Sequence, residues 1–188
     1  MIKSVCIFCG SSSTQKKGAL FKKEHASIAK NVGKKLALKK IKIIYGGANV
    51  GLMGIMADEA LKNNGKVIGV AMKSFKNWGV LHKKISKMYL VNTLQKRKEL
   101  MYKKSDAFIV LPGGIGTIDE AFDVIATNIL TKSVKPLIIL NYKKFWNKLI
   151  ELLDTNIKQR YSKKEIKDNI KVTTSIDKIF TIINNSYF

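Results

Sequence analysis

The stretch Leu111-Pro112-Gly113-Gly114-Ile115-Gly116-Thr117-Ile118-Asp119-Glu120 decides the fold of this chain. It follows the apolar run 107–111, which predicts a buried strand, and precedes residues 121–125, whose apolar spacing is typical of a helix. Pro112 ends the strand because it has no N–H group to donate to a neighbouring strand. The glycine-rich turn is a candidate anion site, since free backbone N–H groups and the positive end of the helix dipole point the same way there.

Thr117 and Glu120 admit two interpretations. Thr117 could cap the helix while Glu120, three residues later, reaches back to it, which is the capping-box pattern. Alternatively, residues 113–117 bind a phosphate group and Glu120 is a catalytic carboxylate beside it. The capping box explains Thr117 and Glu120. It does not explain three glycines in four positions, because glycine weakens a helix start without adding packing.

Strands alternate with helices on both sides of this turn. The expected strands are residues 4–9, 42–45, 66–71, 85–91, 106–111, 137–141 and 171–174. The expected helices are residues 19–39, 52–63, 93–104, the segment from the turn to 130, 142–157, 162–168 and a last helix capped by Ser175. Apolar strands between amphipathic helices are typical of a parallel sheet covered on both faces. We predict an α/β fold: a single Rossmann-like, doubly wound domain over residues 1–188, mostly parallel, with a C-terminal strand and helix extension at 170–188.

Three loops rich in glycine and serine follow predicted strands, at residues 10–14, 46–51 and 113–117. Loops at the carboxyl ends of parallel strands line the ligand crevice of such folds, so a nucleotide is the expected ligand. The P-loop pattern of ATPases and GTPases is absent. The first turn lacks the dinucleotide fingerprint, no acidic residue ends the second strand, and no lysine is singled out for pyridoxal phosphate.

The chain is strongly basic, with 35 lysine and arginine residues against 13 acidic ones and a net charge of +22. Such a charge could serve nucleic-acid binding. The lysines are spread over nearly every segment, however, and aromatic residues do not alternate with them as a base-stacking surface requires. We therefore predict solvated lysine faces that attract anionic substrates, with no specific nucleic-acid partner. Without a long apolar run or a signal-peptide pattern, we expect no membrane association and a cytoplasmic location.

Among these basic residues just two are arginines, Arg97 and Arg160. In a chain that uses lysine almost everywhere, an arginine indicates a place where the planar guanidinium is needed for bidentate recognition. Arg160 lies near the chain end among polar residues and is expected at the surface. Arg97 is therefore the candidate site residue.

Two further groups have weaker signals. Cys6 and Cys9 lie three apart in a predicted strand and so face opposite ways, which favours Cys6 in the core and Cys9 near the site rim over a redox or metal pair. His82 lies in an irregular segment, residues 72–84, that could form a flap. It could act as a general base, although a lone loop histidine is more often polar surface.

Five motifs of the chain, in order, resemble the LONELY GUY family of cytokinin riboside 5′-monophosphate phosphoribohydrolases, formerly called lysine decarboxylases. They are Phe8-Cys9-Gly10-Ser11-Ser12, Tyr45-Gly46-Gly47-Ala48-x-x-Gly51-Leu52-Met53-Gly54, Arg97-Lys98-Glu99-Leu100-Met101, Ser105-Asp106-Ala107-Phe108-Ile109 and Pro112-Gly113-Gly114-x-Gly116-Thr117-x-x-Glu120. One such motif is weak evidence, whereas several in order are strong. The resemblance covers roughly residues 2 to 150.

The resemblance implies an enzyme that hydrolyses the N-glycosidic bond of a nucleoside 5′-monophosphate, a cytokinin nucleotide or AMP, to free base and ribose 5-phosphate. Glu120 would stabilise positive charge on the ribose and orient or deprotonate water, and Arg97 would hold Glu120 or a substrate oxygen. The implied phosphate and substrate contacts are Gly113, Gly114, Ile115, Gly116, Thr117, Lys98, Gly10, Ser11, Gly47 and Met53. No metal or cofactor is implied. Family members form homodimers, which would place Leu94, Leu100 and Met101 at or near the interface.

Three positions depart from the family pattern. Leu94-Gln95-Lys96 replaces Met-His-Glu, Gly79 stands where a glutamate is common, and Ala126-Thr127 replaces a Thr-Trp pair. These departures concern the base and ribose contacts rather than Arg97 and Glu120. The alternative function is a carrier that binds a nucleotide or phosphorylated cofactor without hydrolysing it. A nucleic-acid-binding function would leave the glycine loops unexplained.

Overall fold

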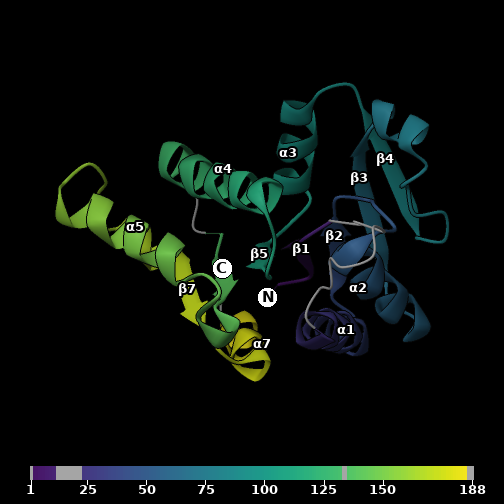
Figure 1. Cartoon of the computed structure of the whole chain (residues 1–188), viewed down its shortest axis with the longest axis horizontal. Helices are drawn as coiled ribbons and strands as arrows, with labels where there is room; N and C mark the ends of the chain where they lie inside the picture. The colour runs from purple at the N-terminus through teal and green to yellow at the C-terminus, as the bar shows by residue number, and fades with distance from the viewer. Residues whose placement is uncertain (1, 12–22, 133–134, 186–188) are drawn as a thin grey trace.

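A computed structural model describes residues 2–11, 23–132 and 135–185 (Figure 1). Its strands form one parallel sheet in the order β4-β3-β2-β1-β5-β6-β7. The strands are β1 (Ser4–Phe8), β2 (Lys42–Tyr45), β3 (Val67–Met72), β4 (Lys87–Val91), β5 (Ala107–Val110), β6 (Leu137–Leu140) and β7 (Ile170–Thr173). The helices are α1 (Lys23–Leu38), α2 (Gly51–Lys62), η1 (Lys73–Trp78), α3 (Leu94–Lys103), α4 (Ile115–Thr131), η2 (Tyr142–Lys144), α5 (Asn147–Lys158), α6 (Ile166–Asn169) and α7 (Ile176–Asn185). The α/β prediction is confirmed, and the described sheet is wholly rather than mostly parallel.

Helices cover both faces of the sheet (Figure 1). In β1, Val5 and Ile7 pack into the core layer formed with α1, α2 and α7. Cys6 and Phe8, which alternate with them, pack into the layer formed with α3 and α4. This alternation is the two-residue period of a strand buried on both sides.

The apolar spacing of α1 explains how this helix packs against α2. Ile28, Val32 and Leu36 recur every four residues of α1 and are buried. Gly33 lies on the same face, where an added Cβ would stand 2.4 Å from the carbonyl oxygen of Met56 in α2. The helices are therefore in close backbone contact. Truncating the fully buried Leu36 to alanine should lower the unfolding free energy by about 2–5 kcal/mol.

The chain changes direction across the sheet between β1 and β5. From β1 it winds to β2 on one side, and from β5 it winds to β6 on the other. The loops that follow these two neighbouring strands therefore diverge and open a crevice at their carboxyl ends. They are joined where the Leu111 N–H donates to the carbonyl oxygen of Phe8 (2.9 Å) and the Gly10 N–H to that of Pro112 (3.1 Å).

Two predicted helices differ from the structure. The helix expected at 142–157 begins only at Asn147, because Lys143 and Lys144 adopt φ of 47° and 63°. The Asn141 side chain accepts a hydrogen bond from the Trp146 N–H (2.8 Å), which stabilises a turn instead of a helical start. The helix expected at 162–168 is reduced to the single turn α6.

The C-terminal segment joins the same sheet. β7 pairs with β6, and α7 buries Ile179, Phe180 and Ile183 in the layer shared with α1 and α2. The predicted cap is confirmed, because the Asp177 N–H donates to Ser175 Oγ (3.2 Å). The predicted helix start at 19–22 and loop residues 12–14 lie outside the described residues.

Candidate functional site

A cavity of about 500 Å³ opens at the carboxyl ends of the central strands, where the fold predicts a ligand crevice. The loops after β1 and β2, the η1 segment, the start of α3 and the first turns of α4 surround it. Its lining residues are Cys9, Gly10, Ser11, Gly46, Ala48, Val50, Met53, Phe75, Trp78, Val80, Leu94, Arg97, Gly114, Ile115, Gly116, Thr117, Asp119 and Glu120. The cavity therefore brings together segments up to 111 positions apart in the chain, from Cys9 to Glu120.

Arg97 and Glu120 form an ion pair in this cavity. Arg97 Nη1 lies 2.8 Å from Glu120 Oε1, and the two side chains are 9% and 12% exposed. Arg97 Nε also donates to the carbonyl oxygen of Val70 in β3 (2.9 Å). The guanidinium is thus anchored to the sheet on one edge and to the carboxylate on the other. The structure brings together the two residues that the sequence singled out.

Gly46 makes room for Arg97. A Cβ at position 46 would stand 2.4 Å from Arg97 Nη2 and 3.1 Å from Met53 Sδ. The neighbouring Gly47 has a different role, because its φ is +80° and its Cβ would meet Met88 Sδ at 2.9 Å. The sequence predicts Gly47 as a site residue and does not single out Gly46. The structure places Gly46, and not Gly47, among the lining residues.

Burial raises the pKa of the Glu120 carboxyl above its ordinary value, and the Arg97 guanidinium partly opposes this effect. A raised pKa beside a specific charge partner is typical of carboxyls in functional sites. Tight pairing to a fixed arginine also sets the orientation of this carboxylate. Glu120 is therefore equipped for acid–base or charge-stabilising chemistry.

The capping-box interpretation of the glycine loop is wrong. Helix α4 begins at Ile115, with Gly114 as its N-cap and no side-chain capping bond. Thr117 lies within the first turn and is 4% exposed. The amides of Thr117 and Ile118 bond to the carbonyl oxygen of Gly114. The earlier amides, of Ile115 and Gly116, have no intrahelical acceptor in an α-helix and point toward the cavity end.

The three loop glycines divide into two kinds. A Cβ at Gly113 would stand 2.1 Å from Thr117 Oγ1 and 3.0 Å from the Gly10 nitrogen, so packing alone requires glycine there. At Gly114 and Gly116 a Cβ would meet nothing within 4 Å. Neither has a positive φ, and both line the cavity. Open space beside these two glycines fits a ligand that approaches the backbone closely.

The remaining predicted contact residues also fall into two groups, those that line the cavity and those that do not. Gly10, Ser11, Met53, Ile115 and Thr117 line the cavity, whereas Gly113 and Lys98 do not. Lys98 Nζ instead bridges Asp119 Oδ1 (3.0 Å) and Asp123 Oδ1 (3.1 Å) on α4. These pairs outweigh burial and raise the Lys98 pKa. Lys98 thus ties α3 to α4 beside the Arg97–Glu120 pair.

His82 is not polar surface, and it does not line the cavity. It is 4% exposed, its Nε2 lies 3.1 Å from Asp58 Oδ1, and its Nδ1 accepts from the Lys84 N–H. The ring therefore fixes the segment 80–82, which also pairs with the loop after β2 through the Ala48–Leu81 bridge. Its contacts support the segment that carries the cavity residue Val80.

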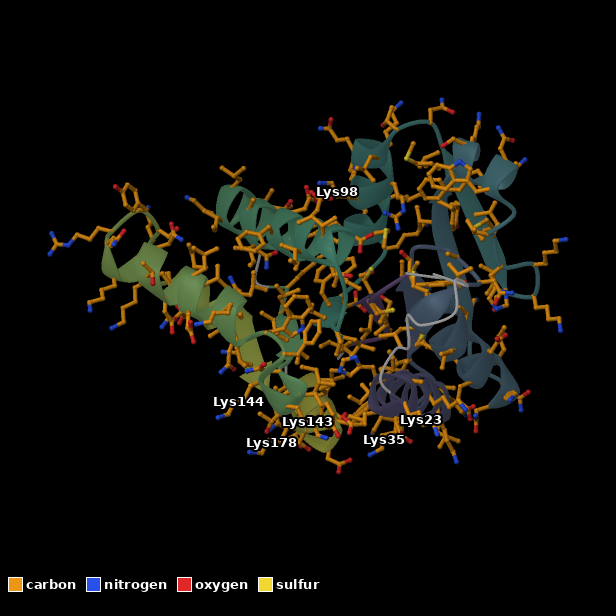
Figure 2. The ribbon with its side chains drawn as sticks, viewed as in Figure 1. Lys23, Lys35, Lys98, Lys143, Lys144 and Lys178 are labelled. Atoms are coloured by element: carbon orange, nitrogen blue, oxygen red, sulfur yellow. The ribbon has the colours of Figure 1, made fainter. Side chains whose placement is uncertain are left out.

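The cysteines and Arg160 lie as expected. Cys6 and Cys9 are free and pack in opposite core layers, with Cys9 at the cavity. Arg160 is exposed. In Figure 2, Lys23, Lys35, Lys143, Lys144 and Lys178 lie on the side of the molecule that holds α1 and α7, and Lys98 lies apart from them beside α3.

An aromatic wall was missed by the sequence analysis. Phe75 and Trp78 in η1 stack with ring centroids 4.6 Å apart, and Trp78 is 65% exposed at the cavity mouth. Val50, Val80 and other apolar side chains continue this wall. The signal available was the pair of aromatic residues in the irregular segment 72–84. Gly79, the departure from the family glutamate, ends η1 with a φ of 64°.

Residues 53–183 match the profile of a protein family described as "possible lysine decarboxylase". The chain belongs to this family. As a member, it is 35% identical over 153 residues to the cytokinin riboside 5′-monophosphate phosphoribohydrolase of Rhodococcoides fascians, covering 81% of this chain and 74% of that protein. It is 32% identical to cytokinin riboside 5′-monophosphate phosphoribohydrolase LOG1 of Arabidopsis thaliana, covering 85% and 72%. It spans 61% of the length of the rice relative LOGL6. The resemblance to the LONELY GUY family is thereby confirmed.

Solved structures confirm the fold of this family member. TM1055 aligns with a TM-score of 0.76 at 20% identity, over 98% of this chain and 99% of that one. The molybdenum cofactor carrier protein of Chlamydomonas reinhardtii aligns with a TM-score of 0.69 at 16% identity, over 98% and 97%. At these identities the likeness concerns the fold alone. No helix among the described residues is long and apolar enough to cross a membrane.

Proposed function

We propose that this chain hydrolyses the N-glycosidic bond of a nucleoside 5′-monophosphate and releases the base and ribose 5-phosphate. The observation that carries the proposal is the Arg97–Glu120 ion pair, buried in a cavity beside the N-terminal end of α4. A buried carboxylate that an arginine holds in one orientation suits acid–base or charge-stabilising chemistry. The relatives named as phosphoribohydrolases support the same reaction.

The 5′-phosphate binds at the start of α4 in this proposal. The open space at Gly114 and Gly116 admits the anion, and the helix dipole favours its charge. Glu120 follows Gly114 by six residues on the same helix, a rise of about 9 Å. That separation is comparable to the length of ribose 5-phosphate. A phosphate bound at Gly114 would therefore place the ribose near Glu120.

The reaction then proceeds at the ribose C1′ atom. As the C1′–N bond breaks, its electrons leave with the base and positive charge develops on the ribose. The Glu120 carboxylate stabilises that charge and accepts a proton from the attacking water, whose oxygen bonds to C1′. The departing base nitrogen takes up a proton from solvent, and Glu120 returns the proton of the attacking water to solvent, so the net reaction consumes one water. Arg97 keeps Glu120 oriented, and its link to Val70 keeps Arg97 fixed.

The base lies against the apolar wall in this arrangement. Phe75, Trp78 and Val80 offer contact for the base and for an apolar substituent on it. We therefore propose that an N6-isopentenyl adenine nucleotide is preferred over AMP. Burying even one or two added carbon groups favours the larger substrate by about tenfold or more.

The carrier alternative requires binding without turnover. The experiment incubates the purified protein with AMP and, separately, with isopentenyladenosine 5′-monophosphate. Chromatography then measures the free base, which distinguishes an enzyme from a carrier. Release of base supports hydrolysis, and faster release from the isopentenyl nucleotide supports the preference. Saturable binding of both nucleotides without base release would instead establish a carrier.

We also propose a homodimer that meets near the start of α3. The family resemblance implies that Leu94, Leu100 and Met101 lie at or near this interface. Met101 is 1% exposed and packs in the chain's own core, behind the exposed surface of α3. Leu94 is 45% exposed and Ile115 is 83% exposed, both at the cavity mouth. Multi-angle light scattering at micromolar concentration should give twice the chain mass of 21.1 kDa.

The cytoplasm remains the proposed location. The scattered lysines are proposed to attract anionic substrates rather than to recognise nucleic acid. Binding to duplex DNA should then be weak and fall steeply with salt.

A further inference from the structure

A second hollow, of about 590 Å³, lies at the amino ends of β2, β3 and β4. The catalytic cavity lies at the carboxyl ends, so the length of the strands separates the two. We call this cavity the lysine hollow. Its lining residues are Lys42, Lys66, Ile68, Ser86, Lys87, Tyr89, Lys103 and Lys104. Five of the eight are lysines, and none is acidic.

The strand register places three of these lysines on one face of the sheet. Ile43 pairs with Val67, so Lys42 and Lys66, each one residue earlier, lie side by side in neighbouring strands about 4.8 Å apart. Ile68 pairs with Lys87, and residues two apart in a strand share a face. Lys42, Lys66 and Lys87 therefore project from the same corner of the sheet.

Helix α3 supplies the other wall. It packs on the same face and ends at Lys103, with Lys104 as its C-cap (Figure 1). Lys104 Nζ lies 4.3 Å from the ring centroid of Tyr89, and Lys87 Nζ lies 4.8 Å from it. Tyr89 thus holds two ammonium groups, one from the strand and one from the helix, at the edge of the hollow.

Little opposite charge balances these lysines. Lys103 pairs with Glu99, whereas for Lys42, Lys66, Lys87 and Lys104 no carboxylate lies within ion-pair distance in the described part of the chain. Like charges directly opposite one another across neighbouring strands destabilise a sheet. An anion in the hollow would remove that repulsion and contact several ammonium groups at once.

We propose that the lysine hollow binds a small anion that carries several linked phosphate groups. The volume is that of a small-molecule site, and its cationic lining matches a compact, multiply charged ligand. A nucleic acid would favour cations spread along a surface and a free aromatic face. Here the lysines converge on one hollow, and the ring of Tyr89 is already occupied by Lys87 and Lys104.

The test is isothermal titration calorimetry with inorganic tripolyphosphate, which carries the linked phosphates without a base. The variant is Lys42→Gln with Lys66→Gln. Its matched control is Lys30→Gln with Lys34→Gln, which removes two exposed lysines from α1. At about 0.15 M salt, where surface charges are screened beyond about 8 Å, wild type and control should bind saturably and alike. The hollow variant should lose about tenfold in affinity for each lysine removed.

Circular dichroism and thermal melting first establish that both variants are folded, and base release from AMP should be the same in both as in wild type. Absence of saturable tripolyphosphate binding to wild type would overturn the proposal. So would an equal loss in the two variants, because binding would then follow net charge. A duplex DNA fragment that binds more tightly than tripolyphosphate, and loses that affinity in the hollow variant, would also overturn it in favour of a polynucleotide.

Discussion

Arg97 Nη1 lies 2.8 Å from Glu120 Oε1, and this contact joins α3 to α4 at the floor of the cavity. Arg97 is additionally bonded to the carbonyl oxygen of Val70, and the absence of a side chain at Gly46 leaves space for its other nitrogen. Three segments of the chain therefore fix one guanidinium, which in turn fixes one carboxylate. Each prediction about the proposed reaction follows from this arrangement.

Glu120→Gln should reduce kcat/KM for nucleotide hydrolysis by about 10²–10⁴-fold, as expected for loss of a general acid–base group. Glutamine still accepts a hydrogen bond from Arg97, but it leaves the buried guanidinium without a counter-charge. Because burial raises the Glu120 pKa despite Arg97, the ionised form is already disfavoured in the folded chain, so this neutral replacement should change the unfolding free energy at neutral pH little. Steady-state kinetics and urea unfolding measure the two effects. A variant that keeps most of its activity would remove Glu120 from the mechanism.

Activity should rise with pH through an apparent pKa above the ordinary glutamate value of 4.5, because burial raises the pKa of Glu120 and the reaction uses its ionised form. Arg97→Met removes the charge that opposes this shift, so its acid limb should move to still higher pH. Profiles of kcat/KM for both proteins measure the shift. Identical acid limbs in wild type and Arg97→Met would contradict the coupling.

The contribution of Glu120 to the unfolding free energy falls as pH rises, whereas its contribution to activity rises with pH. A carboxyl with a raised pKa binds its proton more tightly in the folded chain, so its contribution is fully present below the unfolded pKa and is lost as pH rises through the folded pKa. Glu120→Gln should therefore flatten the pH dependence of unfolding across that interval. Urea unfolding at a series of pH values compares the two proteins.

Gly114→Ala and Gly116→Ala should fold normally yet bind substrate more weakly, because their added Cβ atoms enter space that nothing in the chain occupies. Gly113→Ala is the contrasting variant, since its Cβ would collide with Thr117 and must displace the loop. Thermal melting should separate Gly113→Ala, by an overpacking cost of about 1–3 kcal/mol, from the other two. Unchanged KM in Gly114→Ala and Gly116→Ala would place the phosphate elsewhere.

The fold was predictable because its signals are local and repeated. Apolar runs such as residues 107–111 alternate with amphipathic helices, and that pattern is specific to a covered parallel sheet. The start of α5 was not predictable in this way. It depends on the side chain of Asn141 bonding to the Trp146 amide and on two lysines with positive φ, which hydrophobic spacing does not reveal.

The site was predictable in its chemistry and less so in its geometry. The rarity of arginine indicated Arg97, and the glycine loop indicated Glu120. Some glycines adjoin unoccupied space, whereas at others a Cβ atom would clash with a neighbour. The difference depends on atoms from segments distant in the sequence, as Gly46 beside Arg97 shows. The capping box failed because α4 starts before Thr117, at a glycine N-cap that has no side chain to signal it. Lys98 likewise finds its partners on α4 rather than in the cavity.

Arg97→Lys tests whether the guanidinium itself is required. Lysine keeps the positive charge but cannot donate to Val70 and Glu120 from two edges of one planar group. Activity should fall by about 10²-fold, the scale of one lost contact in a preorganised site. Steady-state hydrolysis of AMP and of its isopentenyl analogue provides the measurement, with thermal melting to show that the variant is folded.

Lys98→Arg is the matched control, because Lys98 is the next residue of α3 and lies about 100° around the helix from Arg97. It contacts Asp119 and Asp123 rather than the cavity, and arginine can still pair with both carboxylates. Its effect on activity should therefore be small. Equal losses in the two variants would mean that α3 tolerates no exchange of its basic residues. An active Arg97→Lys would mean that charge alone suffices and that the orientation of Glu120 does not depend on the guanidinium.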